Sequence, residues 1–368
     1  MNQIKVGYKY NDYLFRKANK YKIPLSGAFE ITPLCNMSCK MCYSKLTKEE
    51  RDLKGRERSL EEWLYIAEQA KKEGTLFLLL TGGEPFLKKD FKELYISLYN
   101  MGFIISINSN ATLIGEEDVE WLSKYPPMCV NVTLYGGCNE TYNNLCNNPK
   151  GFDQATKGIQ LLKNAGIQVK INASITPYNV NDLEDIIFYA NTNNLHIQAT
   201  TYMFPPIRKD KNLIGKNDRF TSEEAGKILA KINYIKMGEE KFNIYKDKLK
   251  QRISQENDGE CLYTEGKNMQ CRAGVSTYWI TWDGKMLACG MMDNIKSYPF
   301  EEGFKESWAK IVTSTKNVRL PIECANCNNK NICSMCAAKS VTETGESTSV
   351  PTYMCEMTRE YIEEVKNM

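Results

Sequence analysis

The sequence predicts an α/β protein built as a partial barrel of parallel strands, followed by a small cysteine-rich domain. Two observations lead to this fold. Short apolar runs alternate with amphipathic segments between residues 27 and 207, as in a series of six βα units. Eight of the 14 cysteines then fall between residues 261 and 355. A closed barrel of this kind has eight units, so six units predict a barrel that stays open on one side.

The barrel is expected to follow an N-terminal extension, residues 1–26, and to occupy residues 27–207. Its six predicted strands are short apolar runs: Ala28–Thr32, Leu76–Thr81, Phe103–Asn108, Cys129–Leu134, Gln168–Ile175 and Ile197–Tyr202. The predicted helices lie between the strands and have apolar residues at helical spacing: Ser59–Lys72, Lys88–Met101, Glu116–Lys124, Gly151–Ala165 and Asn181–Asn193. Ser59 followed by Glu62 is a capping box, which predicts where the first of these helices begins.

The chain changes character after the barrel. Residues 208–260 are rich in charged residues and contain two helical patterns, Thr221–Met237 and Glu240–Ser254, which predict a charged helical linker. Residues 261–355 combine many cysteines with few apolar runs, which is typical of a small domain folded around metal. A C-terminal helix is expected at residues 356–368. At roughly 150 residues per domain, a chain of 368 residues accommodates this organisation.

Composition excludes several classes of protein. The single histidine, His196, excludes HExxH metalloproteases and most hydrolases that use a Ser–His–Asp triad. A net charge of +3 is too small to predict a nucleic-acid partner. The chain has neither the long apolar run of a membrane span nor the apolar core of a signal peptide. We therefore expect a cytoplasmic protein without a membrane partner, whose reduced cysteines serve as metal ligands or catalysts.

Three cysteines directly after the first predicted strand form a CxxxCxxC motif: Cys35, Cys39 and Cys42. A [4Fe–4S] cluster normally takes four thiolates, so three on one short loop leave one iron open to an outside ligand. A structural zinc site would need a fourth cysteine or histidine close by, and the neighbouring sequence has none. The motif therefore favours an iron–sulfur cluster with an open position.

This loop, the aromatic Tyr43 after it and the segment Thr81–Pro85 at the end of the second strand resemble the CxxxCxxC and GGEP motifs of the radical S-adenosylmethionine (SAM) superfamily. The resemblance implies a partial six-stranded barrel. It also implies that SAM binds the open iron, that an electron from the cluster cleaves its C–S bond, and that the resulting 5′-deoxyadenosyl radical abstracts a substrate hydrogen. The implied SAM-binding residues are Tyr43, Gly82, Gly83, Glu84, Ser109, Asn110, Thr133 and Asn172. Relatives often bind the SAM carboxylate with an Arg after the fourth strand. Here that stretch reads Tyr142–Cys146 and contains no Arg, so the carboxylate partner stays open.

The C-terminal cysteines have the spacing of two four-ligand sites, which suits either zinc or iron–sulfur clusters. Their order resembles the SPASM extension of radical SAM peptide-modifying enzymes, except that two residues rather than three separate Cys333 from Cys336. The resemblance implies two auxiliary [4Fe–4S] clusters and therefore three clusters in all. One would be held by Cys271, Cys289 and Cys336, with Cys261 as the fourth ligand or with one iron left open. The other would be held by Cys324, Cys327, Cys333 and Cys355.

Three cysteines remain outside these sites. Cys129 opens an apolar strand and is expected in the core. Cys138 follows the fourth strand, at the end of the barrel where active sites form, so it is a candidate catalytic residue that returns a hydrogen atom to a substrate radical. The alternative for Cys138, and for Cys146 as well, is an ordinary cysteine without a catalytic role.

The combined motifs predict an anaerobic enzyme that modifies a ribosomally made peptide or protein by cross-linking or oxidation, as in RiPP maturation. Two alternatives lie within the superfamily. One is an anaerobic sulfatase-maturing enzyme that makes formylglycine, although such enzymes carry an Asp where this chain has Gly290, with Asp293 three residues further on. The other is a peptide epimerase that uses Cys138. A non-enzymatic electron-transfer scaffold is disfavoured by the intact motifs. Expected partners are the peptide or protein substrate and an external one-electron reductant of flavodoxin or ferredoxin type. A leader sequence on the substrate would be recognised by a separate leader-binding protein or by the barrel itself, unless the substrate has no leader.

Overall fold

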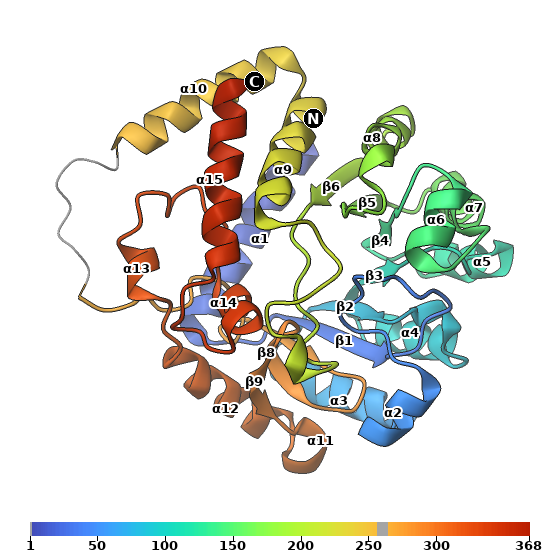
Figure 1. Cartoon of the computed structure of the whole chain (residues 1–368). Coiled ribbons are helices and arrows are strands. Elements are labelled where there is room, and N and C mark those ends of the chain that lie inside the picture. The colour runs from blue at the N-terminus through green and yellow to red at the C-terminus, as the bar shows by residue number, and fades with distance from the viewer. Residues whose placement is uncertain (1, 256–263) are drawn as a thin grey trace.

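The computed structural model describes residues 2–255 and 264–368, and one nine-stranded sheet organises this part of the chain. The strands follow the order β6-β5-β4-β3-β2-β1-β7-β8-β9 across the sheet (Figure 1). Their bounds are β1 Ser26–Thr32, β2 Phe77–Gly82, β3 Ile104–Ser109, β4 Cys129–Thr133, β5 Val169–Ser174, β6 His196–Thr200, β7 Thr277–Ile280, β8 Met286–Cys289 and β9 Met292–Ser297.

The six strands expected from the sequence are β1 to β6, and each pairs in parallel with its neighbour. The predicted α/β fold with a parallel sheet is therefore confirmed, with strand ends that differ from the prediction by one or two residues. The helices between these strands are α2 Lys48–Lys54, α3 Leu60–Lys72, α4 Phe91–Asn100, α5 Glu116–Lys124, α6 Asn139–Cys146, α7 Gly151–Asn164 and α8 Leu183–Thr192, with 3-10 turns η1 Pro85–Leu87 and η2 Val180–Asp182. The capping box predicted at Ser59 forms, since Ser59 accepts a hydrogen bond from the backbone of Glu62 and donates one to its carboxylate.

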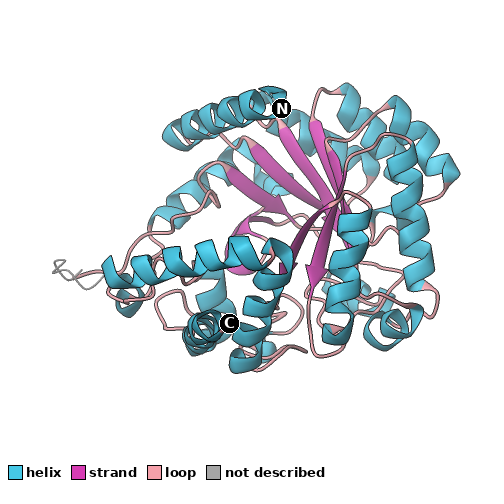
Figure 2. Ribbon diagram, turned by 90° about the horizontal axis from the view of Figure 1, so that it is seen from above, coloured by secondary structure: helices cyan, strands magenta, loops and turns pink. Residues whose placement is uncertain are grey.

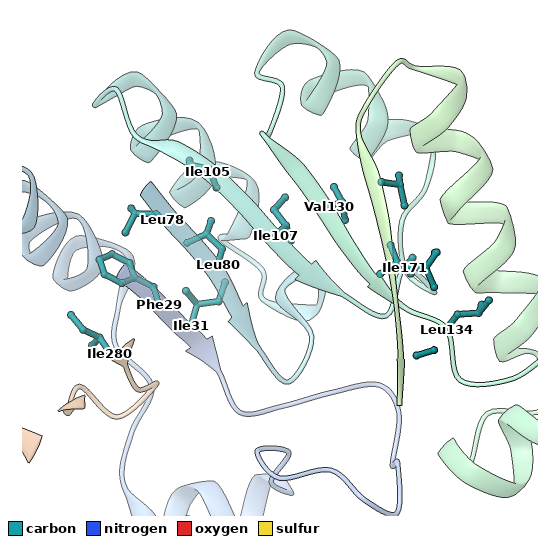
Figure 3. Close-up of a cluster of buried hydrophobic side chains, with 14 of the residues drawn as sticks. Phe29, Ile31, Leu78, Leu80, Ile105, Ile107, Val130, Leu134, Ile171 and Ile280 are labelled. Carbon is teal, nitrogen blue, oxygen red and sulfur yellow. The ribbon is translucent and has the colours of Figure 1, made fainter. Parts of the chain in front are cut away.

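The two faces of the sheet differ in polarity because successive side chains on a strand point in opposite directions. The outer face is apolar and packs beneath the helices that surround the strands in Figure 2. Figure 3 labels part of this core: Phe29, Ile31, Leu78, Leu80, Ile105, Ile107, Val130, Leu134, Ile171 and Ile280. The inner face is polar, and the strand register aligns Glu30 with Thr81, Asn108 with Asn131, and Thr133 with Asn172. The outer face of the barrel is therefore part of the apolar core, and its inner face carries polar side chains that can bind a ligand.

The sheet continues beyond the six expected strands. β7 pairs in parallel with the free side of β1, and β8 and β9 add two antiparallel strands. Tyr278, Ile280 and Met286 from these strands are buried in the same apolar core as the barrel strands. The start of the cysteine-rich region is thus folded onto the barrel rather than around metal alone. A physical reason is that β1 would otherwise leave an unpaired sheet edge.

Helices close the remaining sides of the molecule: α9 Ser222–Met237, α10 Glu239–Gln255, α11 Pro299–Glu302, α12 Phe304–Lys316, α13 Ile322–Ala325, α14 Ala337–Thr344 and α15 Thr352–Asn367, with the 3-10 turn η3 Lys211–Leu213. α9 lies beside α15, where a Cβ on Gly226 would come within 2.5 Å of the carbonyl oxygen of Met357 (Figure 1). Part of the predicted linker is therefore packed closely against the C-terminal helix.

The N-terminal extension forms a helix that was not expected from its polar sequence, α1 Asn2–Tyr21. Its C-terminal half docks on the sequence that precedes β7, where Ser276 donates a hydrogen bond to Asn19 at 2.6 Å and Arg272 stacks over the ring of Phe15. Ser276, which contacts this helix at Asn19, lies more than 250 residues further along the chain. This contact could therefore not be predicted from the local sequence of the helix. No helix within residues 2–255 or 264–368 is long and apolar enough to cross a membrane.

Candidate active site and cysteine clusters

The CxxxCxxC loop lies between β1 and α2, at the end of the sheet where parallel strands of βα units place their active sites. It borders a cavity of about 650 Å³. Most of the residues implied by the resemblance line this cavity together: Cys35, Cys39, Cys42, Tyr43, Gly82, Gly83, Ser109, Asn110, Thr133 and Asn172. Residues from the ends of four strands, β2 to β5, and from the cysteine loop thus meet around a single space.

The loop is held in place by α6. The backbone N–H of Ser38 donates to the carbonyl of Cys146 at 2.8 Å, and that of Lys40 donates to the carbonyl of Leu145 at 3.1 Å. These acceptors belong to the last turn of α6, whose carbonyls have no partner inside the helix. Asn36 adds a side-chain hydrogen bond to Thr112 at 2.8 Å. The three thiols therefore sit on a braced loop.

Burial controls the chemistry of these thiols. It raises the pKa of Cys35 to about 12. A hydrogen bond with the buried Cys146 lowers the pKa of Cys39, while burial and the same hydrogen bond raise the pKa of Cys146. Iron binds thiolates, so loading a cluster must displace a proton from Cys35. Cys146, a spare cysteine in the sequence, is fully buried against the loop.

The two glycines of the GGEP segment allow the backbone after β2 to approach the backbone after β1 closely. Gly82 adopts a φ of +143°, and a Cβ there would lie 2.2 Å from the carbonyl oxygen of Thr32. A Cβ on Gly83 would lie 2.1 Å from the carbonyl oxygen of Leu34. These atoms directly precede Cys35, so the glycines let the end of β2 touch the start of the cysteine loop.

Glu84 is placed differently from the expectation. It was expected to hold the ammonium group of SAM, but it is fully buried and does not line the cavity. Its carboxylate accepts hydrogen bonds from Ser109 Oγ and from the backbone N–H of Asn110, each at 2.8 Å, and from the backbone N–H of Phe86 at 3.2 Å. Burial raises the pKa of Glu84 to about 7, against the effect of these three donors. Glu84 therefore ties the loop after β2 to the loop after β3.

Cys138 also lies apart from the cavity. It is exposed at the N-terminus of α6, its thiol is within 3.4 Å of Thr141 Oγ1, and it is not among the described residues that line the cavity. The loop after β4 turns into α6 directly at Cys138, which directs the thiol toward Thr141 and Asp182. The structure thus gives the epimerase alternative no geometric support. Cys129 is buried, as expected.

Several cavity residues were not found from the sequence. Met291 follows the β8–β9 turn and Lys339 lies on α14, so both come from the cysteine-rich region. Lys339 is 8% exposed, donates to Ser334, and lies 4.7 Å from the ring centre of Tyr202. Burial lowers its pKa. No local pattern marks these residues, because only the packing of distant segments brings them to the cavity.

Four of the C-terminal cysteines meet around another cavity, of about 540 Å³: Cys324, Cys327, Cys333 and Cys355. These are the four implied ligands of one auxiliary cluster. Burial and the neighbouring thiols raise the pKa of Cys324 to about 12. Cys355 comes from α15, whereas the other three lie in the segment around α13.

The other implied ligand set is described in part. Cys289 ends β8, Cys336 precedes α14 and Cys271 is exposed, and the thiols of Cys336 and Cys271 are close enough to act electrostatically on Cys289. Burial raises the pKa of Cys289. Cys261 lies outside the described residues.

The arrangement of thiols bears on the choice between zinc and iron–sulfur clusters. Within the described residues, no three His, Cys, Asp or Glu side chains are arranged to hold a single metal ion. Ligands of a zinc ion converge on one centre, whereas the thiolates of a cubane each bind a different iron and lie further apart. Cys324, Cys327, Cys333 and Cys355 together supply the four thiols that a [4Fe–4S] cluster requires.

A model of the radical SAM superfamily matches residues 29–190, the segment that contains the cysteine loop and strands β2 to β5, whose ends line the larger cavity. The segment 29–190 of this chain belongs to the radical SAM superfamily. Its membership confirms the family predicted from CxxxCxxC and GGEP, and it implies SAM and one [4Fe–4S] cluster as cofactors.

Characterised relatives of this radical SAM enzyme include an AdoMet-dependent heme synthase of Methanosarcina barkeri, 24% identical over 87% of this chain and 93% of the relative. The sporulation killing factor maturation protein SkfB of Bacillus subtilis is 25% identical over 83% of this chain and 68% of the relative. The enzyme is thus related both to a peptide maturation protein and to heme synthases.

Two solved structures of SPASM enzymes share the fold over nearly the whole chain. SuiB of Streptococcus suis bound to S-adenosylmethionine has a TM-score of 0.63 and 18% identity, covering 94% of this chain and 79% of that one. The enzyme anSMEcpe with bound AdoMet has a TM-score of 0.67 and 17% identity, covering 93% and 96%. At these identities the likeness shows a common fold, which includes the cysteine-rich region.

Proposed function

We propose that this radical SAM enzyme is a peptide maturase. It would abstract hydrogen from a side chain of a ribosomally made peptide or protein, with cross-linking or oxidation as the outcome. One observation carries the proposal: the cavity lined by the SAM-motif residues is also lined by Met291 and Lys339 from the cysteine-rich region. A substrate in this cavity therefore lies between the first cysteine loop and the auxiliary cysteines.

The residues at the SAM end of the cavity have distinct roles in this proposal. Cys35, Cys39 and Cys42 would hold the cluster, and the backbone of Gly82 and Gly83, which lines the cavity, would bind the ammonium group of SAM. When bound, the cluster and SAM together supply one electron and a cleavable C–S bond, and so the 5′-deoxyadenosyl radical. The chain would supply a loop fixed by hydrogen bonds to α6 and a cavity that orients SAM and the substrate.

Polar side chains at the strand ends would orient the rest of SAM. Thr133 and Asn172 are register partners on β4 and β5 and both line the cavity, which suits the ribose hydroxyls. Asn110 donates to Asn36 at 3.0 Å, so it is fixed beside the cysteine loop. Tyr43 directly follows Cys42 and lines the cavity, and its side chain is half-buried. Lys45, which also lines the cavity, is a cation within reach of the site and a candidate partner for the SAM carboxylate.

The auxiliary cysteines would hold two further [4Fe–4S] clusters. Cys324, Cys327, Cys333 and Cys355 form one ligand set, and Cys271, Cys289 and Cys336 with Cys261 form the other. Their chemistry would be to accept the electron released when the substrate radical is oxidised.

Relatives support a peptide substrate. SkfB is a maturation protein, SuiB has been solved bound to its precursor peptide SuiA, and anSMEcpe has been solved with AdoMet and the Cp18Cys peptide. The partners of the proposal are a peptide substrate, an external one-electron reductant and a separate leader-binding protein. The formylglycine alternative finds less support, because Asp293 lines a different cavity from the one described above.

The test is anaerobic reconstitution with iron and sulfide, followed by incubation with SAM and dithionite. We expect 5′-deoxyadenosine and about 12 iron per chain, four for each of three clusters. About 4 iron together with two zinc would contradict the auxiliary clusters, and absence of 5′-deoxyadenosine would contradict the radical reaction. Candidate precursor peptides encoded beside the gene should then show a mass change that depends on SAM.

The heme synthase relatives favour a second candidate substrate, a tetrapyrrole, because they match 87% of this chain. Incubating the same reconstituted protein with iron-coproporphyrin and following the product by mass spectrometry separates the two candidates. A mass loss from the tetrapyrrole, with precursor peptides unchanged, would replace the peptide proposal.

A further inference from the structure

A third cavity, of about 240 Å³, lies between the first cysteine loop and the β7–β9 strands. Its lining is strongly basic, with Lys54, Arg208, Lys209, Lys285 and Lys296. Two carboxylates, Asp283 and Asp293, share the wall. This excess of positive charge contrasts with the net charge of the whole chain, which is only +3.

The hydrogen bonds show which of these charges are compensated inside the protein. Arg208 donates to the buried Glu30 at 2.7 Å, and Lys285 forms an ion pair with Asp283 at 2.5 Å. Lys54 and Lys209 instead donate to backbone carbonyls, of Lys209 and Cys42 respectively, which do not cancel a charge. Lys54 and Lys296 are exposed to solvent. The rim of the cavity therefore presents positive charge outward.

The basic cavity adjoins two cysteine sites. Lys209 Nζ lies 3.4 Å from the carbonyl oxygen of Cys42, a ligand of the first cluster. Arg208 donates to the carbonyl of Gly290 at 2.9 Å, and Gly290 directly follows Cys289. One loop, residues 208–209, thus connects the cavity to the SAM-cleaving site and to an auxiliary site.

The position of Tyr43 decides what kind of partner fits. Tyr43 and Ser44 line both this cavity and the larger cavity of the SAM-motif residues, so they form the partition between them. A substrate must reach the strand-end side of that partition to meet the radical. An electron, in contrast, needs only a close approach to the cysteine loop from the outer side.

We propose that the rim of this basic cavity is the docking surface for a small acidic electron-transfer protein of flavodoxin or ferredoxin type. The proposal rests on the proposed function, because it concerns the cluster held by Cys35, Cys39 and Cys42. The donor protein loses one electron and the cluster gains it; no bond forms or breaks, and no proton moves in this step. Complementary charge accelerates encounter and orients the donor.

The experiment measures binding directly. A purified flavodoxin in its oxidised form is passed over the immobilised, reconstituted enzyme, and association rates are measured at an ionic strength of about 0.05 M and about 0.3 M. The double variant Lys54→Glu/Lys296→Glu should associate about tenfold or more slowly at low salt, and the difference should shrink at high salt because the charges are screened. The matched control is Lys92→Glu/Lys157→Glu, which makes the same charge change on exposed positions of α4 and α7. Equal association rates for the two double variants would overturn the proposal.

A second measurement separates the docking surface from the proposed function. Dithionite is a small reductant that does not need a protein docking site, so 5′-deoxyadenosine formation with dithionite should be the same in Lys54→Glu/Lys296→Glu as in the unmodified enzyme. Reduction by flavodoxin hydroquinone, followed by the EPR signal of the reduced cluster, should be slower. If the variant instead weakens binding of an acidic precursor peptide and leaves flavodoxin binding unchanged, the surface is a substrate site and the docking proposal is wrong. If the unmodified enzyme forms no 5′-deoxyadenosine with dithionite, the proposed function fails while the binding result stands on its own.

Discussion

The two cysteine-rich parts of this molecule are built in different ways. The first places three thiols within eight residues of one loop, braced by the end of α6 and by the glycines at the end of β2. The C-terminal cavity gathers four thiols from residues 324 to 355, and the last of them comes from a separate helix, α15. At the first site, contacts with the sheet and its adjoining loops and helix hold the three thiols near one another. At the second site, the fourth thiol reaches the others only because α15 packs beside them.

This difference has consequences for stability. The first loop has hydrogen-bond partners on α6 and on the loop after β3 that do not depend on metal. Around the second cavity, Cys324 lies in the four-residue helix α13, and Cys327 and Cys333 lie in the irregular segment after it, whereas Cys355 is on the long helix α15. We expect metal to contribute more folding free energy to the second site than to the first.

Replacing one thiol in each region gives the largest contrast. Cys39→Ala should lose about 4 iron per chain and all detectable 5′-deoxyadenosine, because the SAM-binding cluster is gone. Cys327→Ala should also lose about 4 iron but still cleave SAM with dithionite. Iron analysis and chromatography of the products measure both effects. Loss of SAM cleavage in Cys327→Ala would show that the two regions are not separable.

Removing iron with a chelator should separate the regions by stability. Hydrogen exchange should speed up strongly across residues 322–336, while the central strands β1 to β4 keep their protection. Mass spectrometry of peptic fragments before and after chelation measures the change. Uniform loss of protection in both regions would contradict the idea that the sheet alone organises the first site.

The junction between the regions is tested by the buried ion pair Arg219–Glu343. The two side chains are each 6% exposed and meet at 2.6 Å, and Glu343 also accepts a hydrogen bond from Tyr202. Glu343→Gln leaves a buried guanidinium without its counter-charge and should lower the free energy of unfolding by about 3–5 kcal/mol. Denaturant unfolding measures the change.

A matched control for that variant is Glu346→Gln, an exposed position close to the end of the same helix, which should change stability by less than about 0.5 kcal/mol. The double variant Arg219→Met/Glu343→Leu should recover much of the loss, because no unpaired charge remains. Failure of the double variant to recover would point to the Tyr202 hydrogen bond as the main contribution.

Glu84→Gln tests the brace at the first site. An amide has one acceptor oxygen, so its NH₂ group must face the backbone N–H of either Asn110 or Phe86. The expected loss is about 1–3 kcal/mol in the free energy of unfolding. Glu93→Gln, on an exposed position of α4, is the control and should have little effect. An unchanged stability for Glu84→Gln would mean that Glu84 is already protonated and that its donors are satisfied in another way.

The smallest effect is expected for Cys138→Ala, because the thiol lies outside the SAM cavity. The yield of 5′-deoxyadenosine and the modification of a precursor peptide should both stay unchanged. The contrary result would come from reactions in deuterated water. If the unmodified enzyme incorporates deuterium at a Cα of the peptide product and Cys138→Ala does not, the epimerase alternative is restored.

Local sequence patterns predicted much of the barrel. Alternating apolar residues placed β1 to β6 within one or two residues, and the capping box at Ser59 marked the start of α3. The short motifs CxxxCxxC and GGEP, together with the strand ends, also predicted most of the residues that the structure brings together around the larger cavity. The structure places Glu84 away from the cavity, where its carboxylate accepts three hydrogen bonds, and no local sequence pattern shows these donors.

The sequence by itself determined the chemistry of this protein: the number and spacing of the thiols, the glycine pair and the polar ends of the strands. These depend on neighbours within a few residues, where geometry follows directly from the chain. Only the tertiary structure decided that β7 would extend the sheet and that Lys339 and Met291 would line the cavity of the SAM-motif residues. Such contacts join segments far apart in sequence, and they depend on which buried surfaces fit together rather than on any local pattern.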